Sequence, residues 1–434
     1  MNKKLILWSV TVGLGGFLFG LDVAVISGAE KAIQQLWNLS DWVHGTAIAT
    51  ALYGTAFGAA FGNYPADKIG RKKTLIWIGI LFFVSSIGAA LAPEINSFML
   101  FRFISGLSIG ASSVVAPLYI AEIAPAKYRG RMVISFQVNI VAGILIAYLS
   151  NYLLQGTGGA DDWRWMLGVV AIPSLIFSVL MLLVPETPRW LVLYKKDDEA
   201  AKKVLALTNQ QGDHLIADIK ASVTSLKVNL FNNKFYKPLL LAFLLAFFNQ
   251  MSGINAIIYF APKVFEMAGI GRDGSLLSTV GIGVVNLIFT IAGWYLIDRL
   301  GRRTLMYIGS IGYIISLALI SYSFYTQQNQ FITYYVFMFI AAHAIGQGAV
   351  IWVFISEIFP NAVRAAGTSF GCLTHWVFAA VIAQVFPYFS GKYGGIEIFA
   401  FFSFMMVLQL IFVWKMMPET KGLSLEAMDK PIMH

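Results

Sequence analysis

Long apolar runs separated by short polar segments dominate the pattern of this 434-residue chain. A helix needs about 20 mostly apolar residues to cross the hydrocarbon core of a bilayer. We identify twelve such runs, at residues 5–28, 43–64, 74–92, 98–121, 132–154, 164–184, 238–262, 275–297, 304–324, 331–355, 365–388 and 397–417. The sequence therefore predicts an all-α membrane protein with twelve transmembrane helices.

The runs fall into two groups of six with a polar stretch between them. Two short amphipathic helices are expected in this stretch, near residues 198–207 and 214–226. The predicted domains are an N-terminal six-helix half at 1–184, a cytoplasmic linker at 185–237, a C-terminal six-helix half at 238–417 and a cytoplasmic tail at 418–434.

The first run begins like a signal peptide, because Lys3 and Lys4 precede it and small residues lie at 27–29. However, it extends over about 24 residues, which is too long for the apolar region of a cleaved signal, and it contains Asp22. We expect a retained first helix.

Lys and Arg residues predict the orientation, because cytoplasmic loops carry an excess of both. With an even number of spans the two termini share one side, and the termini and even-numbered loops together hold 25 of the 31 basic residues. Both termini are therefore expected in the cytoplasm, and the chain in the inner membrane of a bacterium. This placement explains the net charge of +9 without a nucleic-acid partner.

Composition agrees with a lipid environment. Hydrophobic residues make up 58% of the chain and charged residues 12%, about half the charged share of a soluble domain. A single cysteine, Cys372, excludes an intrachain disulfide. We expect no metal and no cofactor, since the sequence has no Cys/His cluster with metal-ligand spacing and no P-loop.

Three motifs occur once in each half, in the same order and at offsets of 231, 235 and 233 residues. They are Asp67-x2-Gly-Arg71 and Asp298-x2-Gly-Arg302, Glu122-Ile-x-Pro and Glu357-Ile-x-Pro, and Pro-Glu186-Thr and Pro-Glu419-Thr. Such repetition indicates a duplicated six-helix unit. Parallel halves of this kind surround a site near the bilayer midplane, which each side can expose in turn.

Acidic residues at matched positions of both halves have no role in positive-inside anchoring. We interpret them as a breakable charge network that latches the cytoplasmic side when the carrier faces outward. The predicted cytoplasmic gate consists of Asp67, Arg71, Glu122, Arg129, Glu186, Arg189, Asp298, Arg302, Glu357, Arg364 and Glu419.

Together these motifs resemble the sugar porter family of the major facilitator superfamily, over nearly the whole chain. Within the family they are most similar to bacterial xylose–proton and related aldose–proton symporters. The elements that carry the resemblance are the paired Asp-x2-Gly-Arg loops, residues 16–22 (GFLFGLD), 128–131 (YRGR), 185–191 (PETPRWL), 249–255 (NQMSGIN) and 418–422 (PETKG).

The resemblance implies a sugar site whose residues are Gln137, Gln250, Asn255, Asn286, Trp352, Asn249, Tyr259, Phe19 and His375. Amides supply the donors and acceptors that sugar hydroxyls require. Their alternative role is hydrogen bonding between helices. Three departures leave the sugar open. Asn249 replaces the first glutamine of a Gln-Gln pair, and Ile144 and His375 replace glutamines of xylose symporters. His375 is either a packed histidine or a sugar ligand.

Asp22 is an acid within the first apolar run, and Arg102 is the one basic residue within any run. A charged side chain at the centre of a membrane helix costs about 2.5–3.5 kcal/mol on insertion scales, so it is a functional candidate. We predict that Asp22 carries the proton and that Arg102 is its partner. The alternative is a permanent structural ion pair. The resemblance favours coupling, because proton symporters of the family carry Asp where facilitative carriers tend to have Asn.

The predicted function is proton-coupled symport of a monosaccharide such as xylose, glucose, arabinose or galactose, by a chain that acts as a monomer. A facilitative uniporter has the same fold. A sugar sensor is a third hypothesis, although sensors of this shape tend to carry long cytoplasmic tails. A membrane enzyme is a fourth hypothesis, and the sequence contains no set of nucleophile, base and orienting residue that would support it.

Overall fold

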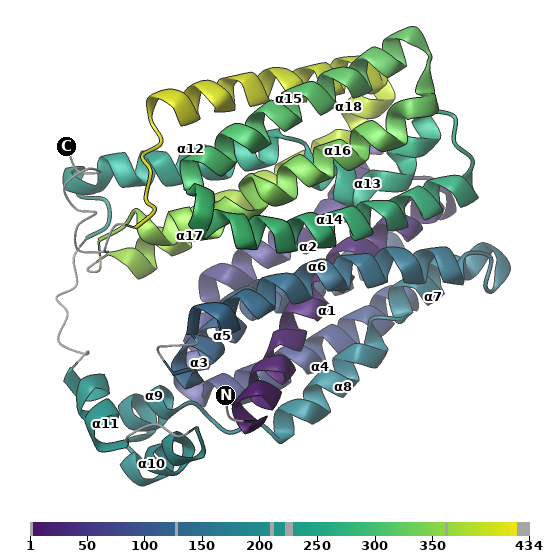
Figure 1. Ribbon diagram of the computed structural model, residues 1–434. Helices are drawn as coiled ribbons and strands as arrows, with labels where there is room; N and C mark the ends of the chain where they lie inside the picture. Colours follow the sequence, from purple (N-terminus) through teal and green to yellow (C-terminus); the bar gives the residue numbers. More distant parts are fainter. Residues whose placement is uncertain (1–2, 126–128, 209–211, 222–228, 361–362, 423–434) are drawn as a thin grey trace. The chain divides into compact units, whose positions relative to one another are not determined.

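The computed structural model describes residues 3–125, 129–208, 212–221, 229–360 and 363–422, and all regular structure among them is helical (Figure 1). The N-terminal helices are α1 (Lys3–Leu36), α2 (Asp41–Phe61), α3 (Asn63–Ile69), α4 (Arg71–Ala90), α5 (Ile95–Ile123), α6 (Arg129–Leu154), α7 (Asp162–Gly168) and α8 (Ala171–Leu182). The linker holds α9 (Pro188–Trp190), α10 (Asp198–Leu207) and α11 (Gly212–Ala221). The C-terminal helices are α12 (Tyr236–Met251), α13 (Ile254–Met267), α14 (Arg272–Leu300), α15 (Arg302–Thr326), α16 (Ile332–Ile345), α17 (Gln347–Glu357) and α18 (Arg364–Lys415).

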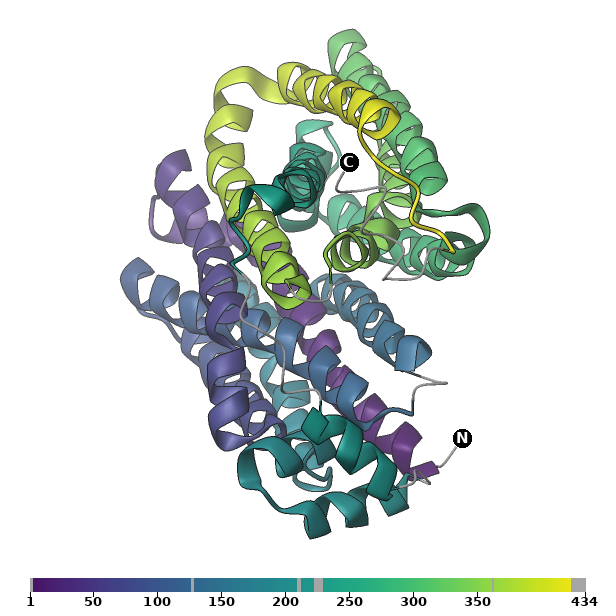
Figure 2. The same cartoon turned by 90° about the vertical axis from the view of Figure 1, so that its left-hand side faces the viewer.

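The predicted count of twelve spans agrees with these helices. Ten helical segments in the described part of the chain are long and apolar enough to cross a membrane. One of them, α18, has 52 residues, whereas about 20 suffice for a crossing. It bends at Gly394, whose φ is 80°, and so supplies the two final spans (Figure 2). The remaining span is α2, whose 21 residues are long enough but include His44 and several threonines.

Three predicted spans are broken where the sequence pattern indicated continuous helices. Residues 164–184 divide into α7 and α8, and the other two spans divide at a glycine. Residues 238–262 divide at Gly253, which has a φ of 81°. A Cβ there would lie 2.5 Å from the ring of Phe402, so only glycine fits. Residues 331–355 divide at Gly346, where a Cβ would lie 2.7 Å from Cα of Gly309. Backbone conformation and close helix packing cause the two breaks at glycine, and neither is visible in hydropathy.

Two compact units make up the fold, and each is described by itself. Unit 1 comprises Met1–Val25, Tyr53–Ala147 and Gly156–Leu226. Unit 2 comprises Ile26–Leu52, Tyr148–Gln155 and Lys227–His434. One end of α1, α2 and α6 therefore packs with the C-terminal helices.

Two of the linker helices, α10 and α11, lie near the two ranges expected for amphipathic helices. The first, α10, has the predicted bounds, and the side chain of Asp197 caps it by accepting a hydrogen bond from the backbone N–H of Ala200. The second, α11, ends at Ala221, and the rest of its predicted range lies outside the described residues. Figure 1 shows α9, α10 and α11 grouped together.

Candidate functional site

Asp22 and Arg102 form a buried ion pair inside unit 1. Nη1 of Arg102, on α5, donates to Oδ2 of Asp22, on α1, over 3.0 Å, and each side chain is 2% exposed. Ser105, one turn further along α5, donates its hydroxyl to the same oxygen over 2.6 Å. Charge-assisted bonds of this kind stabilise the ionised carboxylate. The structure thus brings together the two predicted residues and adds Ser105.

The guanidinium of Arg102 is only partly satisfied. Its Nε and Nη2 are buried and have no hydrogen-bond partner among the described residues. An arginine cannot give up its proton in a protein, so its charge persists whatever the state of Asp22. Protonation of Asp22 would therefore leave a buried charge without compensation, which gives the pair two states of very different electrostatic energy.

Three predicted amides meet where α12 ends and α13 begins, in unit 2. Gln250 donates from Nε2 to Oδ1 of Asn249 over 2.8 Å, and its Oε1 accepts from Nδ2 of Asn255 over 2.7 Å. The break at Gly253 positions these groups, because it turns the chain between Gln250 and Asn255. Broken membrane helices commonly form the binding sites of transporters, since their ends present polar groups at membrane depth.

His375 extends this cluster from α18. Nε2 of Gln250 lies 3.2 Å from Nδ1 of His375. The imidazole also packs between two indoles: its centroid is 4.8 Å from that of Trp352 and 4.8 Å from that of Trp376, at interplanar angles of 60° and 89°. Sequence reasoning missed Trp376, and its position next to His375 in the chain was the available signal.

The other predicted sugar residues are distributed over both units. In unit 2, Tyr259 is buried on α13, and Asn286 on α14 accepts a hydrogen bond from the hydroxyl of Thr290 over 3.4 Å. In unit 1, Phe19 is buried on α1 and Gln137 is half-buried on α6. Asn249, Gln250, Asn255, His375 and Trp352 therefore form one connected cluster, and sugar contact by these residues stays a prediction.

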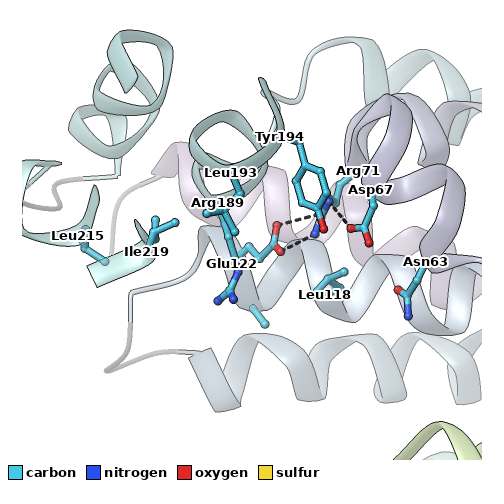
Figure 3. A pocket seen from close by; sticks show the side chains of 11 residues that line it. Asn63, Asp67, Arg71, Leu118, Glu122, Arg189, Leu193, Tyr194, Leu215 and Ile219 are labelled. Atoms are coloured by element: carbon cyan, nitrogen blue, oxygen red, sulfur yellow. Dashed lines mark hydrogen bonds and ion pairs between the residues drawn. The ribbon is translucent and has the colours of Figure 1, made fainter. Parts of the chain in front are cut away.

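A second polar cluster lies at the loop between α3 and α4 (Figure 3). Arg71 donates from Nε and Nη2 to the two carboxylate oxygens of Glu122, over 3.1 and 3.0 Å, and pairs with Asp67 over 2.9 Å. Glu122 also accepts from the hydroxyl of Thr187 over 2.6 Å. Bidentate contact of this kind fixes both distance and orientation.

Glu186 occupies the N-terminus of α4. Its carboxylate accepts hydrogen bonds from the backbone N–H groups of Arg71, Lys72 and Thr187, at 2.9–3.2 Å. A helix N-terminus attracts anions because its first N–H groups lack partners and its dipole is positive there. Burial nevertheless raises the pKa of Glu186 above its ordinary value, against the lowering effect of these bonds.

The second half repeats this arrangement atom by atom. Arg302 donates to both oxygens of Glu357, over 3.2 and 2.8 Å, and pairs with Asp298 over 3.2 Å. Thr420 donates to Glu357 over 2.6 Å. The carboxylate of Glu419 accepts from the backbone N–H groups that begin α15. The internal repeat read from the sequence thus extends to individual hydrogen bonds.

The bonds described above for each network join residues of one half. Arg364 donates to the carbonyl oxygen of Phe359 over 3.1 Å. The side chain of Arg129 lies outside the described residues. Pairing between the networks of the two halves stays a prediction.

A cavity of about 550 Å³ adjoins the first network, between the spans and the linker helices of unit 1. Figure 3 shows Arg189, Leu193 and Tyr194 entering it from the linker and Asp67 and Arg71 from the spans. The ring of Tyr194 lies 5.4 Å from the guanidinium carbon of Arg71. Sequence reasoning missed Tyr194. The linker therefore contacts the first network directly, through Tyr194.

Comparisons with known proteins extend over the same length of chain. The profile of the family described as "Sugar (and other) transporter" matches residues 8–431. The arabinose-proton symporter of Bacillus subtilis is 36% identical, covering 98% of this chain and 94% of the relative. The D-xylose-proton symporter of Escherichia coli K12 is 33% identical, covering 96% and 93%.

Solved structures agree with these relatives. The xylose transporter XylE from E. coli, in a partially occluded inward-open conformation, matches with a TM-score of 0.87 and 31% identity, over 98% of this chain and all of that chain. The proton:xylose symporter XylE bound to 6-bromo-6-deoxy-D-glucose matches with a TM-score of 0.83 over the full length of both chains. The sequence, the fold and the duplicated networks lead to one conclusion: this chain belongs to the sugar transporter family of the major facilitator superfamily.

Proposed function

We propose that this protein is a proton-coupled symporter of a monosaccharide. The observation that carries the proposal is the pair of Asp22 and Arg102, buried within helices that must lie in a membrane. A carboxylate held there by one persistent cation can exist in two states, paired and ionised or protonated and released. Relatives named as arabinose-proton and xylose-proton symporters support the coupling and the aldose class.

The sugar binds, in this proposal, at the cluster around Gln250. The amides of Asn249, Gln250 and Asn255 present donors and acceptors to sugar hydroxyls, and Trp352 presents an apolar face to the ring carbons. Phe19, Gln137, Tyr259 and Asn286 complete the proposed site. The present bonds between the amides are internal, so a sugar would exchange them for bonds of its own.

The two Arg–Glu networks form the cytoplasmic gate. Their bidentate bonds hold the ends of neighbouring helices within each half, and each half can then move as a unit. We place the chain in a bacterial inner membrane with both termini in the cytoplasm, because the basic residues concentrate on that side. A monomer suffices, since one chain supplies both halves.

Uptake into proteoliposomes tests the function. The purified protein is reconstituted, an inward-directed proton gradient is imposed, and accumulation of labelled xylose, arabinose, glucose and galactose is measured. We expect accumulation of at least one aldose above its external concentration. In Asp22→Asn, uphill accumulation should be lost while sugar binding survives. The matched control is Asp161→Asn, because Asp161 forms an exposed pair with Arg164.

A facilitative uniporter remains the second candidate, and the same assay separates the two. Downhill uptake that never exceeds the external concentration, with or without the gradient, would assign the protein to uniport. Absence of both uptake and binding for every sugar of the panel would remove the transporter proposal for aldoses.

A further inference from the structure

A second buried pair of ionisable side chains lies in unit 2, apart from every residue in the proposal above. Nε2 of His44, on α2, is 2.7 Å from Oε2 of Glu30, on α1, and the two side chains are 0% and 3% exposed. Nδ1 of His44 has no hydrogen-bond partner among the described residues. Buried ionisable groups are costly in a membrane protein, so this pair calls for a role.

The pair rests on a kink in α13. The imidazole of His44 packs against the ring of Phe260, with centroids 6.0 Å apart at 69°. Phe260 has φ −124° and ψ 26°, which is not helical, although it lies inside α13. Its ring also packs on Phe386, with centroids 5.2 Å apart. His44 thus contacts the kink of the helix that carries Asn255 and Tyr259.

Pro262 explains the kink. A proline lacks the N–H that would bond the carbonyl four residues earlier, and its ring clashes with that carbonyl. The affected carbonyl belongs to Ile258, and the hydroxyl of Tyr148, on α6, donates to it over 3.1 Å. Residues of α2 and α6 therefore both support the bent segment of α13.

Several other charged groups on these elements have partners of their own. Lys31, which follows Glu30 on α1, pairs with Glu266 of α13. On α2, Asp41 accepts from Gln34 over 2.9 Å. Past the α6 end, Gln155 bonds Asp273 of α14. On α18, Lys392 lies over the rings of Tyr388 and Tyr393. None of these bonds involves Glu30 or His44, which contact each other.

We propose that Glu30 and His44 form a second proton site, separate from Asp22, which takes up one proton when these helix ends close on the kink of α13. A carboxylate beside a neutral imidazole would bury one uncompensated negative charge. The same pair with one more proton is neutral as a whole. On the predicted topology these ends face the outside, so the external pH acts on this closure. The proposal rests on the proposed function only for the role of α13 in sugar binding.

The direction of the pH effect follows from linkage. In water an imidazole loses its extra proton near about pH 6.5, while a carboxylate is ionised above about pH 4.3. The water-exposed pair therefore carries one proton fewer than the buried pair at about pH 7 to 8. Closure then takes up a proton, so it weakens as pH rises through this range. Below about pH 6 the exposed pair already carries the proton, and the dependence disappears.

Cysteine accessibility on the full chain in proteoliposomes tests this site. In a Cys372→Ser background, Ala261→Cys reports on the kink, because Ala261 is fully buried next to Phe260. Leu36→Cys, at an exposed position, corrects for the effect of pH on the thiol itself. We expect the ratio of the two maleimide rates to rise about five- to tenfold from pH 6 to pH 8, since one proton gives at most tenfold per pH unit.

Variants separate this site from general loss of packing. Glu30→Gln should reduce the rise to less than twofold, because the neutral amide removes the charge that demands a proton. In His44→Gln the rise should already begin below pH 6, near the ordinary pKa of a carboxylate at about 4.3, because Glu30 alone must then be protonated on burial. The control is His343→Gln, a half-buried histidine in another span, whose partner is the hydroxyl of Tyr313. It should keep the parental rise.

The proposal would be overturned if the ratio of maleimide rates rose in Glu30→Gln as much as in the parent. It would also be overturned if His343→Gln reduced this rise as much as Glu30→Gln does. If Glu30→Gln is too unstable to purify, the double variant Glu30→Gln/His44→Gln replaces it, because its two amides can hydrogen-bond each other. Its ratio of maleimide rates should also be independent of pH. The readout needs no sugar. If the ratio of maleimide rates rose as expected in a protein that binds no aldose, the proposed function would be contradicted but the proton site would still be supported.

Discussion

Arg102 donates a hydrogen bond to Asp22 across 3.0 Å, with both side chains buried within unit 1. The two partners differ in one chemical respect: Asp22 can neutralise itself by binding a proton, whereas Arg102 cannot lose one. This asymmetry is what a coupling site requires, and it also makes the two single substitutions unequal.

We expect Asp22→Leu to destabilise the protein more than Arg102→Leu. Breaking a buried pair costs about 3–5 kcal/mol when a charge is left uncompensated, and only in Asp22→Leu is that charge unavoidable. The double variant Asp22→Leu/Arg102→Leu should be more stable than Asp22→Leu alone. Thermal unfolding in detergent measures all three. Equal melting temperatures for the two single variants would show that the guanidinium finds another partner.

Gln250→Ala should weaken sugar binding. Losing one hydrogen bond to an uncharged group costs about 0.5–1.5 kcal/mol, or about two- to tenfold in affinity, and more if a partner is left unpaired. Gln409→Ala is the control, since Gln409 is an equally buried amide that bonds Gln347 and Ser310 instead. Binding to the reconstituted protein measures both. If Gln250→Ala and Trp352→Ala both bound sugar with the affinity of the parent, the sugar site would lie elsewhere.

Neutralising Glu357, which accepts two hydrogen bonds from Arg302, should shift the conformational equilibrium of the carrier. In Glu357→Gln, Arg302 loses the less exposed of its two ionic partners, so we expect a shift toward the inward-facing state and a larger loss of transport than of sugar binding. Asp298→Asn controls for charge alone, because Asp298 is 79% exposed and such pairs contribute about 0–1 kcal/mol. The accessibility of introduced cysteines from each side of the membrane measures the distribution between inward-facing and outward-facing states. Parental transport and distribution in Glu357→Gln would remove the gate role.

Gly70→Ala and Gly301→Ala should destabilise the two halves in the same way. Their φ values are 102° and 90°, and a Cβ would lie 2.2 Å from Glu186 and 2.5 Å from Glu419, respectively. Gly156→Ala is the control, because its φ is also positive, at 76°, but nothing lies within 4 Å of a Cβ there. Left-handed backbone costs about 1–2 kcal/mol without glycine, so melting temperatures should fall further in the first two variants. A fall no larger than that of Gly156→Ala would mean that the glutamates move aside freely.

Stability near Glu186 should depend on pH in a defined direction. Burial raises the pKa of this carboxyl, so the folded protein holds the proton more tightly than the unfolded chain. Its stabilising contribution is full below the ordinary pKa and declines as pH rises through the raised value. Glu186→Gln lacks this decline, so its melting temperature relative to the parent should increase from pH 4.5 to pH 7. A constant difference would contradict the raised pKa.

Hydropathy and charge by themselves determined the number of spans and their grouping into two halves. Length and apolarity are nearly sufficient in a membrane, since the bilayer allows few backbone arrangements other than helices. The repeat also identified Glu186 and Glu419 as equivalent before their bonds were visible, because equal motifs at equal spacing must fold alike.

Only the tertiary structure decided which side chains meet. Gly253 and Gly346 look like ordinary span glycines, and the breaks there depend on Phe402 and Gly309, which are far away in the sequence. Nothing in the chain pairs Glu30 with His44, because the contact depends on the angle between α1 and α2. Hydrophobicity is a local property that each segment carries with it, whereas a buried polar contact depends on how distant helices pack, and packing is settled only by the whole fold.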